Sequence, residues 1–186
     1  MTSAEEQNSS QSPFELLRAI DRQSRVRAKA FPSRHEVVRE WVGIVFRIRR
    51  NPLVTPLLAV AEIITPPTVA SVPGVKPWVM GIANMRGTLL PIMDMQGFLY
   101  RGNDAPDLRM RRVLVVALGG HWAGLLVDSV VGLRRFRVDA RSEQLPPLDP
   151  EVKPFVTYGY QLGEARYALM NVSALIEDRS FLDVTI

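Results

Sequence analysis

Short apolar runs, each ended by a turn, follow one another along the chain from Glu40 onward. The runs are rich in Val, Ile and Leu, and the breaks between them contain Pro, Gly, Asn or Asp, which is typical of strands joined by tight connections. We therefore predict a mainly β fold. The expected strands cover 41–48, a bent strand or strand pair at 53–64, then 81–83, 89–99, 113–118, 121–127 with a continuation to 133, 155–160 and 167–170, before a short helical turn at 172–176.

The first part of the chain has a helical pattern instead. Ser12-Pro13-Phe14-Glu15 is a helix start, with serine as the cap, proline at the first helical position and glutamate three residues after the serine. We expect residues 1–36 to hold a disordered tail and this helix, and residues 37–180 to form the main domain. The helix packs on that domain or docks on a partner; its mixed charge disfavours binding to a membrane surface.

A five-residue segment occurs twice in the chain. Val75-Lys76-Pro77-Trp78-Val79 is followed 77 residues later by Val152-Lys153-Pro154-Phe155-Val156. Each copy comes after a strand, a turn and a second strand with one acid, which is Glu62 in the first case and Asp128 in the second. The repeat predicts two related units of short strands. Since each would be too small to be stable alone, we expect two small β-barrels that share a hydrophobic core.

Composition argues against several classes of function. The chain has 186 residues, no cysteine and two histidines, His35 and His121, so disulfides, thiolate sites and histidine metal clusters are not expected. It contains no glycine-rich phosphate loop and no nucleophile elbow, so we expect no enzyme, no cofactor and no metal. The start is polar and acidic, unlike a signal peptide, and no apolar stretch is long enough for a membrane span. These features predict a cytoplasmic protein.

Arginine-rich segments leave an alternative function open. Clusters at 47–50, 109–112 and 134–137 could let a basic small-barrel module bind nucleic acid or another anionic partner. The formal net charge is only +4, however, and few aromatic side chains lie among the arginines to stack on bases. We therefore do not expect nucleic acid as the main partner.

Two charged residues interrupt apolar strands in the first unit. Arg86 lies in the polar hinge Asn84-Met85-Arg86-Gly87, whose glycine suits a turn with positive φ, and Glu62 stands alone in an earlier strand. A lone buried charge would be costly. We therefore predict a Glu62–Arg86 salt bridge at the barrel surface. The pair either only orients the hinge or also shapes a partner-binding face, and its small contribution to stability favours the second role. Asp94 and Asp128 also stand singly in apolar runs, and the sequence indicates no partner for either.

Several motifs occur together between residues 38 and 178. They are Val60-Ala61-Glu62-Ile63, Val72-Pro73-Gly74, Gly81 with the hinge at 84–87, Leu90-Pro91-Ile92-Met93-Asp94, and Gly124-Leu125-Leu126-Val127-Asp128-Ser129-Val130. Together they resemble the CheW family, scaffold proteins that couple chemoreceptors to a histidine kinase. The resemblance implies two five-stranded, SH3-like barrels with a shared hydrophobic core, and a function without catalysis.

The resemblance also implies partners and a site. Family members bind the cytoplasmic tip of a chemoreceptor and the CheW-like regulatory domain of a CheA-type histidine kinase, so the chain is expected in the cytoplasm, recruited to membrane receptor arrays without inserting into the membrane. The receptor-binding positions map to Val60, Glu62, Gly81, Asn84 and Arg86. The added N-terminal helix resembles the one found in the branch of the family that controls type IV pili and twitching motility. Two positions depart from the family pattern, Met85 in place of leucine and Asn171 in place of aspartate.

Overall fold

The computed structural model describes residues 39–102, 107–118 and 121–186, and the expected N-terminal helix lies outside them. The described strands are β1 (Glu40–Ile48), β2 (Asn51–Pro56), β3 (Glu62–Ile64), β4 (Val79–Met85), β5 (Thr88–Asp94), β6 (Arg112–Leu118), β7 (His121–Val127), β8 (Ser129–Arg137), β9 (Arg141–Ser142), β10 (Val156–Leu162) and β11 (Ala165–Met170). The helices are α2 (Met95–Tyr100), α3 (Val172–Glu177) and α4 (Arg179–Leu182), with 3-10 turns η1 (Leu57–Ala59), η2 (Val138–Ala140) and η3 (Lys153–Phe155). Within these ranges, no helix is long and apolar enough to cross a bilayer.

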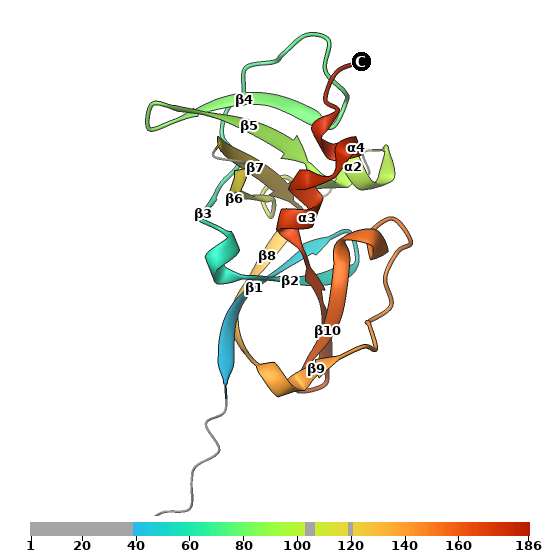
Figure 1. The fold of residues 1–186 in the computed structure, drawn as a ribbon. Coiled ribbons are helices and arrows are strands. Elements are labelled where there is room, and N and C mark those ends of the chain that lie inside the picture. Colours follow the sequence, from blue (N-terminus) through green and yellow to red (C-terminus); the bar gives the residue numbers. More distant parts are fainter. Residues whose placement is uncertain (1–38, 103–106, 119–120) are drawn as a thin grey trace, which may run out of the picture. The chain divides into compact units, whose positions relative to one another are not determined.

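The strands form two mixed sheets (Figure 1). The six-stranded sheet has the order β8-β1-β2-β11-β10-β9, and the five-stranded sheet has the order β3-β6-β7-β5-β4. The pairs β2–β11 and β5–β7 are parallel. The predicted mainly β fold is therefore confirmed. The six-stranded sheet exceeds the expected five strands because the two-residue strand β9 pairs with β10, in a stretch for which the sequence analysis expected no strand.

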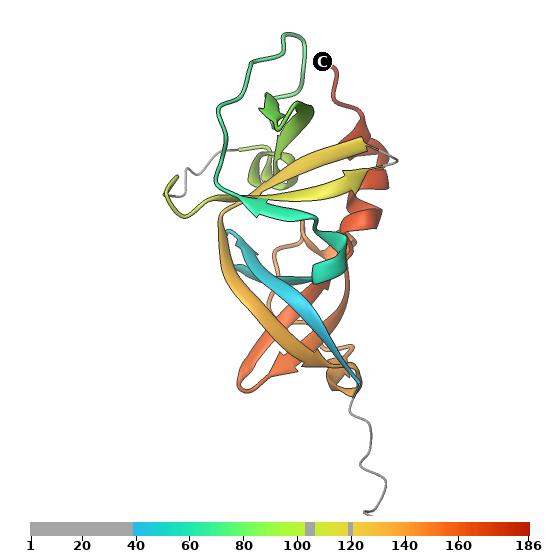
Figure 2. The same cartoon turned by 90° about the vertical axis from the view of Figure 1, so that its left-hand side faces the viewer.

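The two halves of the chain exchange hairpins. The β1–β2 hairpin pairs with β8 and β11, whereas the β6–β7 hairpin pairs with β3 and β5. Each sheet thus combines a hairpin from one half of the chain with strands from the other half (Figure 2). The repeated five-residue segments lie at equivalent places, because each leads into a hairpin followed by a short helix, β4–β5–α2 or β10–β11–α3.

One hydrophobic cluster joins the two sheets. It includes Ile44 and Phe46 of β1, Leu114 of β6, Leu125 of β7 and Leu175 of α3, all of which are fully buried. Figure 1 shows α3 between the sheets, and a smaller cluster lies against each sheet separately. Because side chains from both sheets fill the same core, neither sheet would keep its buried surface without the other.

Two stretches differ from the strands that the sequence suggested. The apolar stretch 53–64 is a strand pair divided between the sheets, since β2 ends, η1 follows and β3 belongs to the other sheet. The prediction that the strand continues to Leu99 is wrong. Asp94 Oδ1 accepts a hydrogen bond from Gln96 N (3.1 Å), so Asp94 caps helix α2 and the strand ends there. Asn171 caps α3 in the same way by accepting from Ala174 N (3.1 Å).

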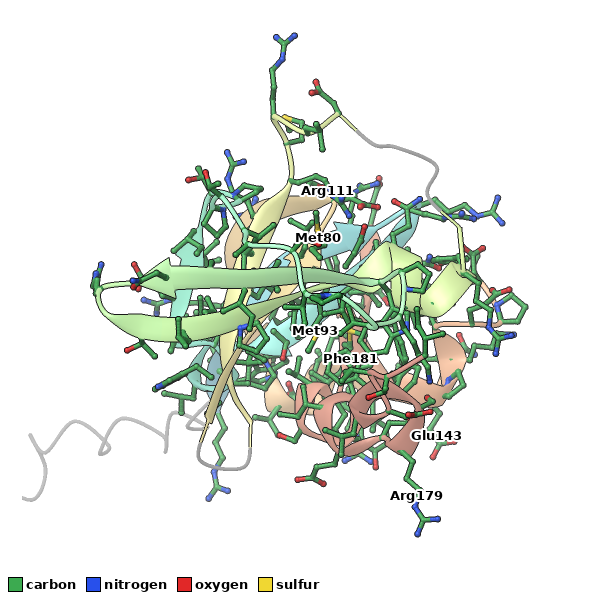
Figure 3. All side chains as sticks on the ribbon, turned by 90° about the horizontal axis from the view of Figure 1, so that it is seen from above. Met80, Met93, Arg111, Glu143, Arg179 and Phe181 are labelled. Atoms are coloured by element: carbon green, nitrogen blue, oxygen red, sulfur yellow. The ribbon has the colours of Figure 1, made fainter. Side chains whose placement is uncertain are left out.

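A buried arginine lies where the chain crosses from one sheet to the other. Asp128 is the single residue between β7 and β8, and its Oδ2 accepts a hydrogen bond from Arg49 N (2.5 Å) in the β1–β2 turn. Arg111, labelled in Figure 3, lies just before β6. Its Nη2 lies 2.5 Å from Asp94 Oδ1 and 3.6 Å from Asp128 Oδ1. Burial raises the pKa of Asp128. The sequence analysis found no partner for Asp94 or Asp128, and the structure shows that Arg111 is the partner of both.

A second network connects the β1–β2 turn with the segment before η3. Asn51 Nδ2 donates to Asp149 Oδ2 (3.0 Å), and Asp149 N donates to Asn51 Oδ1 (2.9 Å). The Tyr100 hydroxyl donates to the same carboxylate (2.8 Å), and Arg50 Nη2 lies 2.7 Å from Asp149 Oδ1. These donors, the Asn51 amide first, lower the pKa of Asp149 to about 2. Burial raises the pKa of Tyr100.

Replacing Arg111 with methionine is expected to destabilise the fold by about 3–5 kcal/mol, because two buried carboxylates would lose their shared cation. Urea unfolding at neutral pH measures the loss. The matched control is Arg109→Met, whose exposed guanidinium lies 3.8 Å from Asp107 and should contribute about 1 kcal/mol or less. Equal losses for the two variants would contradict the prediction. The Arg111→Met deficit should shrink on acidification, because Asp128, whose pKa is already raised, can then take up a proton.

Asp149→Asn is expected to lower stability at neutral pH by an amount that disappears in acid. The folded-state pKa of about 2 lies below the ordinary aspartate value of about 4, so the folded protein binds this proton less readily than the unfolded chain. The carboxylate therefore stabilises the fold above about pH 4, and this contribution is lost as the pH falls toward about 2. Thermal unfolding of wild type and variant across this range should show the difference narrowing. A stability difference between wild type and Asp149→Asn that stays constant with pH would refute this prediction. Asp107→Asn, at an exposed position, serves as the control.

Candidate functional site

The polar hinge is the tip of the β4–β5 hairpin. Met85 pairs with Thr88, which leaves Arg86 and Gly87 as the two central residues of the turn. Their φ angles are 51° and 86°, and positive φ at both central positions is typical of a type I′ turn. Asn84 Oδ1 accepts a hydrogen bond from Gly87 N (3.0 Å) and holds the turn in shape. The sequence analysis placed Arg86 within a strand. In the structure Arg86 instead projects from the turn between β4 and β5.

The structure brings Glu62 and Arg86 together. Arg86 Nη2 lies 3.1 Å from Glu62 Oε1, as the sequence predicted for this pair. Glu62 begins β3 and Arg86 follows β4, which are the two edge strands of the five-stranded sheet, so the pair brings these edges toward each other. The side chains are 81% and 37% exposed for Arg86 and Glu62. An ion pair this exposed contributes about 0–1 kcal/mol, so stability alone gives little reason for it.

Gly81 has a structural role beneath this surface. Its φ is 137°, and an added Cβ would lie 2.2 Å from the carbonyl oxygen of Ala70. Ala70 forms a bridge with Ile82, with N–O distances of 2.8 and 2.9 Å, so the backbone can approach only a glycine here. The other half of the chain repeats this approach, because a Cβ on Gly159 would lie 2.4 Å from the Gln144 carbonyl oxygen.

Val60 is also buried, in the core that joins the sheets. The exposed apolar side chains are its neighbours in the chain: Leu58 on η1 is 99% exposed, and Ile63 on β3 is partly exposed. Leu89, which pairs with Asn84 across the hairpin, is exposed as well. Sequence reasoning missed these leucines, although Pro56 just before η1 was a signal that the strand ends there and that the next residues leave the sheet.

Three of the five mapped positions are therefore surface residues. Glu62, Asn84 and Arg86 form what we call the hairpin face, which consists of a carboxylate, an amide and a cation with the exposed Leu89 beside Asn84. Gly81 and Val60 are buried and do not belong to this face. Such a face can bind a surface that is partly apolar and partly acidic. Among the described residues, no group of three or more His, Asp or Glu side chains could hold a metal ion.

Each arginine cluster has at least one member that pairs with a carboxylate of the protein. Arg50 binds Asp149, and Arg137 Nε lies 2.9 Å from Asp139 Oδ1. Arg111, at the centre of the cluster 109–112, is buried between two carboxylates. These pairs reduce the positive charge that the clusters present to solvent, which weakens the case for a nucleic-acid interface.

Comparison with known proteins points to one family. The profile of the CheW-like domain matches residues 42–180. The protein PilI of Pseudomonas aeruginosa is 44% identical over 177 residues, which cover 95% of this chain and 98% of PilI. The protein FrzA of Myxococcus xanthus is 32% identical over 102 residues, 55% of this chain and 61% of FrzA.

A solved structure gives the same fold. The crystal structure of the scaffolding protein TtCheW from Thermoanaerobacter tengcongensis superposes with a TM-score of 0.66, covering 76% of this chain and 96% of that one at 20% identity. At this identity the likeness supports the fold alone. Since the family profile covers most of the chain and the relative PilI aligns over nearly its whole length, the chain belongs to the CheW-like family of scaffold proteins.

Proposed function

We propose that this chain is the adaptor that couples a chemoreceptor to a CheA-type histidine kinase in the chemosensory system of type IV pili and twitching motility. As a CheW-like scaffold it works in chemosensory signalling by binding other proteins. The similarity to PilI over 98% of that protein favours the pilus branch of the family. Its place in the cell would be the cytoplasm, next to membrane receptor arrays, without insertion into the bilayer.

The exposed Glu62–Arg86 pair carries the receptor part of this proposal. The pair adds little stability, yet Arg86 adopts a left-handed backbone conformation that non-glycine residues seldom take. The turn and the Asn84 hydrogen bond hold its guanidinium at the hairpin tip, close to the exposed Leu89, which pairs with Asn84. A helical receptor tip with an apolar stripe and acidic side chains would complement this hairpin face in charge and polarity.

The kinase would bind elsewhere, through its own CheW-like domain. Sheet edges in this fold offer unpaired backbone groups, and partner domains of the same architecture can join such edges by strand pairing. We assign no single kinase-contact residue. Separate surfaces for receptor and kinase are what a coupling protein requires, because both partners must be bound at once.

Arg86→Glu is expected to weaken binding of the receptor's cytoplasmic tip by about tenfold or more, because a like charge would replace a complementary one at the interface. Isothermal titration of the full chain against the receptor tip and against the kinase's CheW-like domain measures both affinities. The kinase affinity should stay unchanged. A wild-type protein that binds neither partner, and instead binds DNA with a steep salt dependence, would favour the nucleic-acid alternative.

The double variant Glu62→Arg/Arg86→Glu separates two roles of the pair. It restores an ion pair of reversed direction, so it should recover receptor binding if the pair only orients the hinge, and fail to recover it if Arg86 contacts the receptor. We expect no recovery. Arg166→Glu, an exposed change on β11, lowers the net charge by two as Arg86→Glu does, and is the charge-matched control for that single variant. Gly81 variants cannot serve here, because any side chain at Gly81 would displace the Ala70 backbone.

A further inference from the structure

An open, mostly apolar groove lies between helix α2, turn η3 and the segment that leads into β4. Its volume is about 790 Å³, within the range of sites that bind small ligands or side chains. No residue of the hairpin face lines it. The wall is aromatic: Trp78 and Phe98 meet edge to face with ring centroids 5.1 Å apart, and Phe155 lies 5.9 Å from Phe98.

The C-terminal segment holds the groove in shape. Phe181 stacks on Trp78 with ring centroids 5.4 Å apart (Figure 3 labels Phe181). Lys76 N donates to Val184 O (2.8 Å), and Lys76 Nζ lies 2.6 Å from Asp183 Oδ2. The aromatic wall is therefore ordered before any partner arrives, which lowers the entropic cost of binding.

The charges around the groove leave one cation available. Of the lining charges, Asp94 is paired with Arg111 and Lys76 with Asp183. Glu151 also lines a neighbouring hollow together with two arginines of the β1–β2 turn. Arg101 is exposed and forms no ion pair with the residues that the structure describes.

The backbone at Arg101 gives a second reason to regard it as functional. It follows α2 in a left-handed conformation (φ 51°), a position where helices commonly end in glycine. An arginine at this position costs stability that a glycine would not. The charged side chain is thus held at the groove rim in spite of its backbone.

We propose that this groove is a second interaction surface, which binds a protein segment with an aromatic side chain next to carboxylates. The aromatic ring would pack against Trp78 and Phe98, and a carboxylate would pair with Arg101. This surface is independent of the receptor function proposed above, since it shares no residue with the hairpin face.

Capped tripeptides added to the full-length, ¹⁵N-labelled protein test the proposal. The probe is acetyl-Asp-Phe-Asp-amide, compared with acetyl-Asn-Phe-Asn-amide, which lacks the charges, and acetyl-Asp-Ala-Asp-amide, which lacks the ring. The chain has three tryptophans, so the indole N–H signals of Trp41 and Trp122 are internal controls for that of Trp78. We expect the first peptide to shift the Trp78 signal and leave the other two in place.

Variants then separate the cation from the groove. Arg101→Gln should weaken binding of the charged peptide by about two- to fivefold, as expected for one exposed ion pair. It should leave the affinity for the uncharged peptide unchanged. Arg166→Gln should have no effect. Arg101→Gly should raise the midpoint temperature of unfolding. It should weaken binding of the charged peptide as much as Arg101→Gln does. The proposal is overturned if no peptide shifts Trp78, if the charged and uncharged peptides bind equally, or if Arg101→Gln and Arg166→Gln behave alike.

Discussion

The rest of the structure depends on one guanidinium buried between two carboxylates. Arg111 precedes β6, Asp94 ends β5, and Asp128 is the residue at which the chain leaves one sheet for the other. Asp128 also binds the β1–β2 hairpin twice, through its carboxylate to Arg49 N in the turn and through its own N–H to the carbonyl of Arg47 in β1 (3.0 Å). A crossing one residue long allows little adjustment, so this ion cluster sets where β8 can begin and therefore how β8 pairs with β1.

The exchange of hairpins follows from that crossing. With β6–β7 in one sheet and β8 in the other, the second half of the chain contributes to both sheets, and so does the first half through β1–β2. The apolar faces then meet in a common core, and the two sheets cannot separate without exposing it. What remains for partners is the periphery, namely hairpin tips, sheet edges and the groove beside α2. A rigid centre with several separate peripheral surfaces suits a protein that holds others together.

The sequence predicted the features that depend on short-range patterns. The alternation of apolar runs and turns gave most strands, the repeated segment gave the two related units, and the isolated charges Glu62 and Arg86 were correctly expected to meet. Features that depend on distant packing were not accessible. Arg111 stands among other arginines and looks like a solvated surface residue, yet it is buried because two acids from other strands surround it. Helix α2 was missed because its apolar residues continue the strand pattern, and only the cap at Asp94 distinguishes it.

Burial decides what an arginine–carboxylate pair does in this protein. Between Arg111 and its two acids, water is excluded, so removing one partner leaves an uncompensated charge and the fold bears the cost. Between Arg86 and Glu62, solvent screens the attraction and the fold gains little. The exposed pair can therefore exchange one partner for another at low cost, which is the property that a binding surface needs. The same chemistry thus stabilises the centre and leaves the hairpin tip available for the receptor contact that we propose.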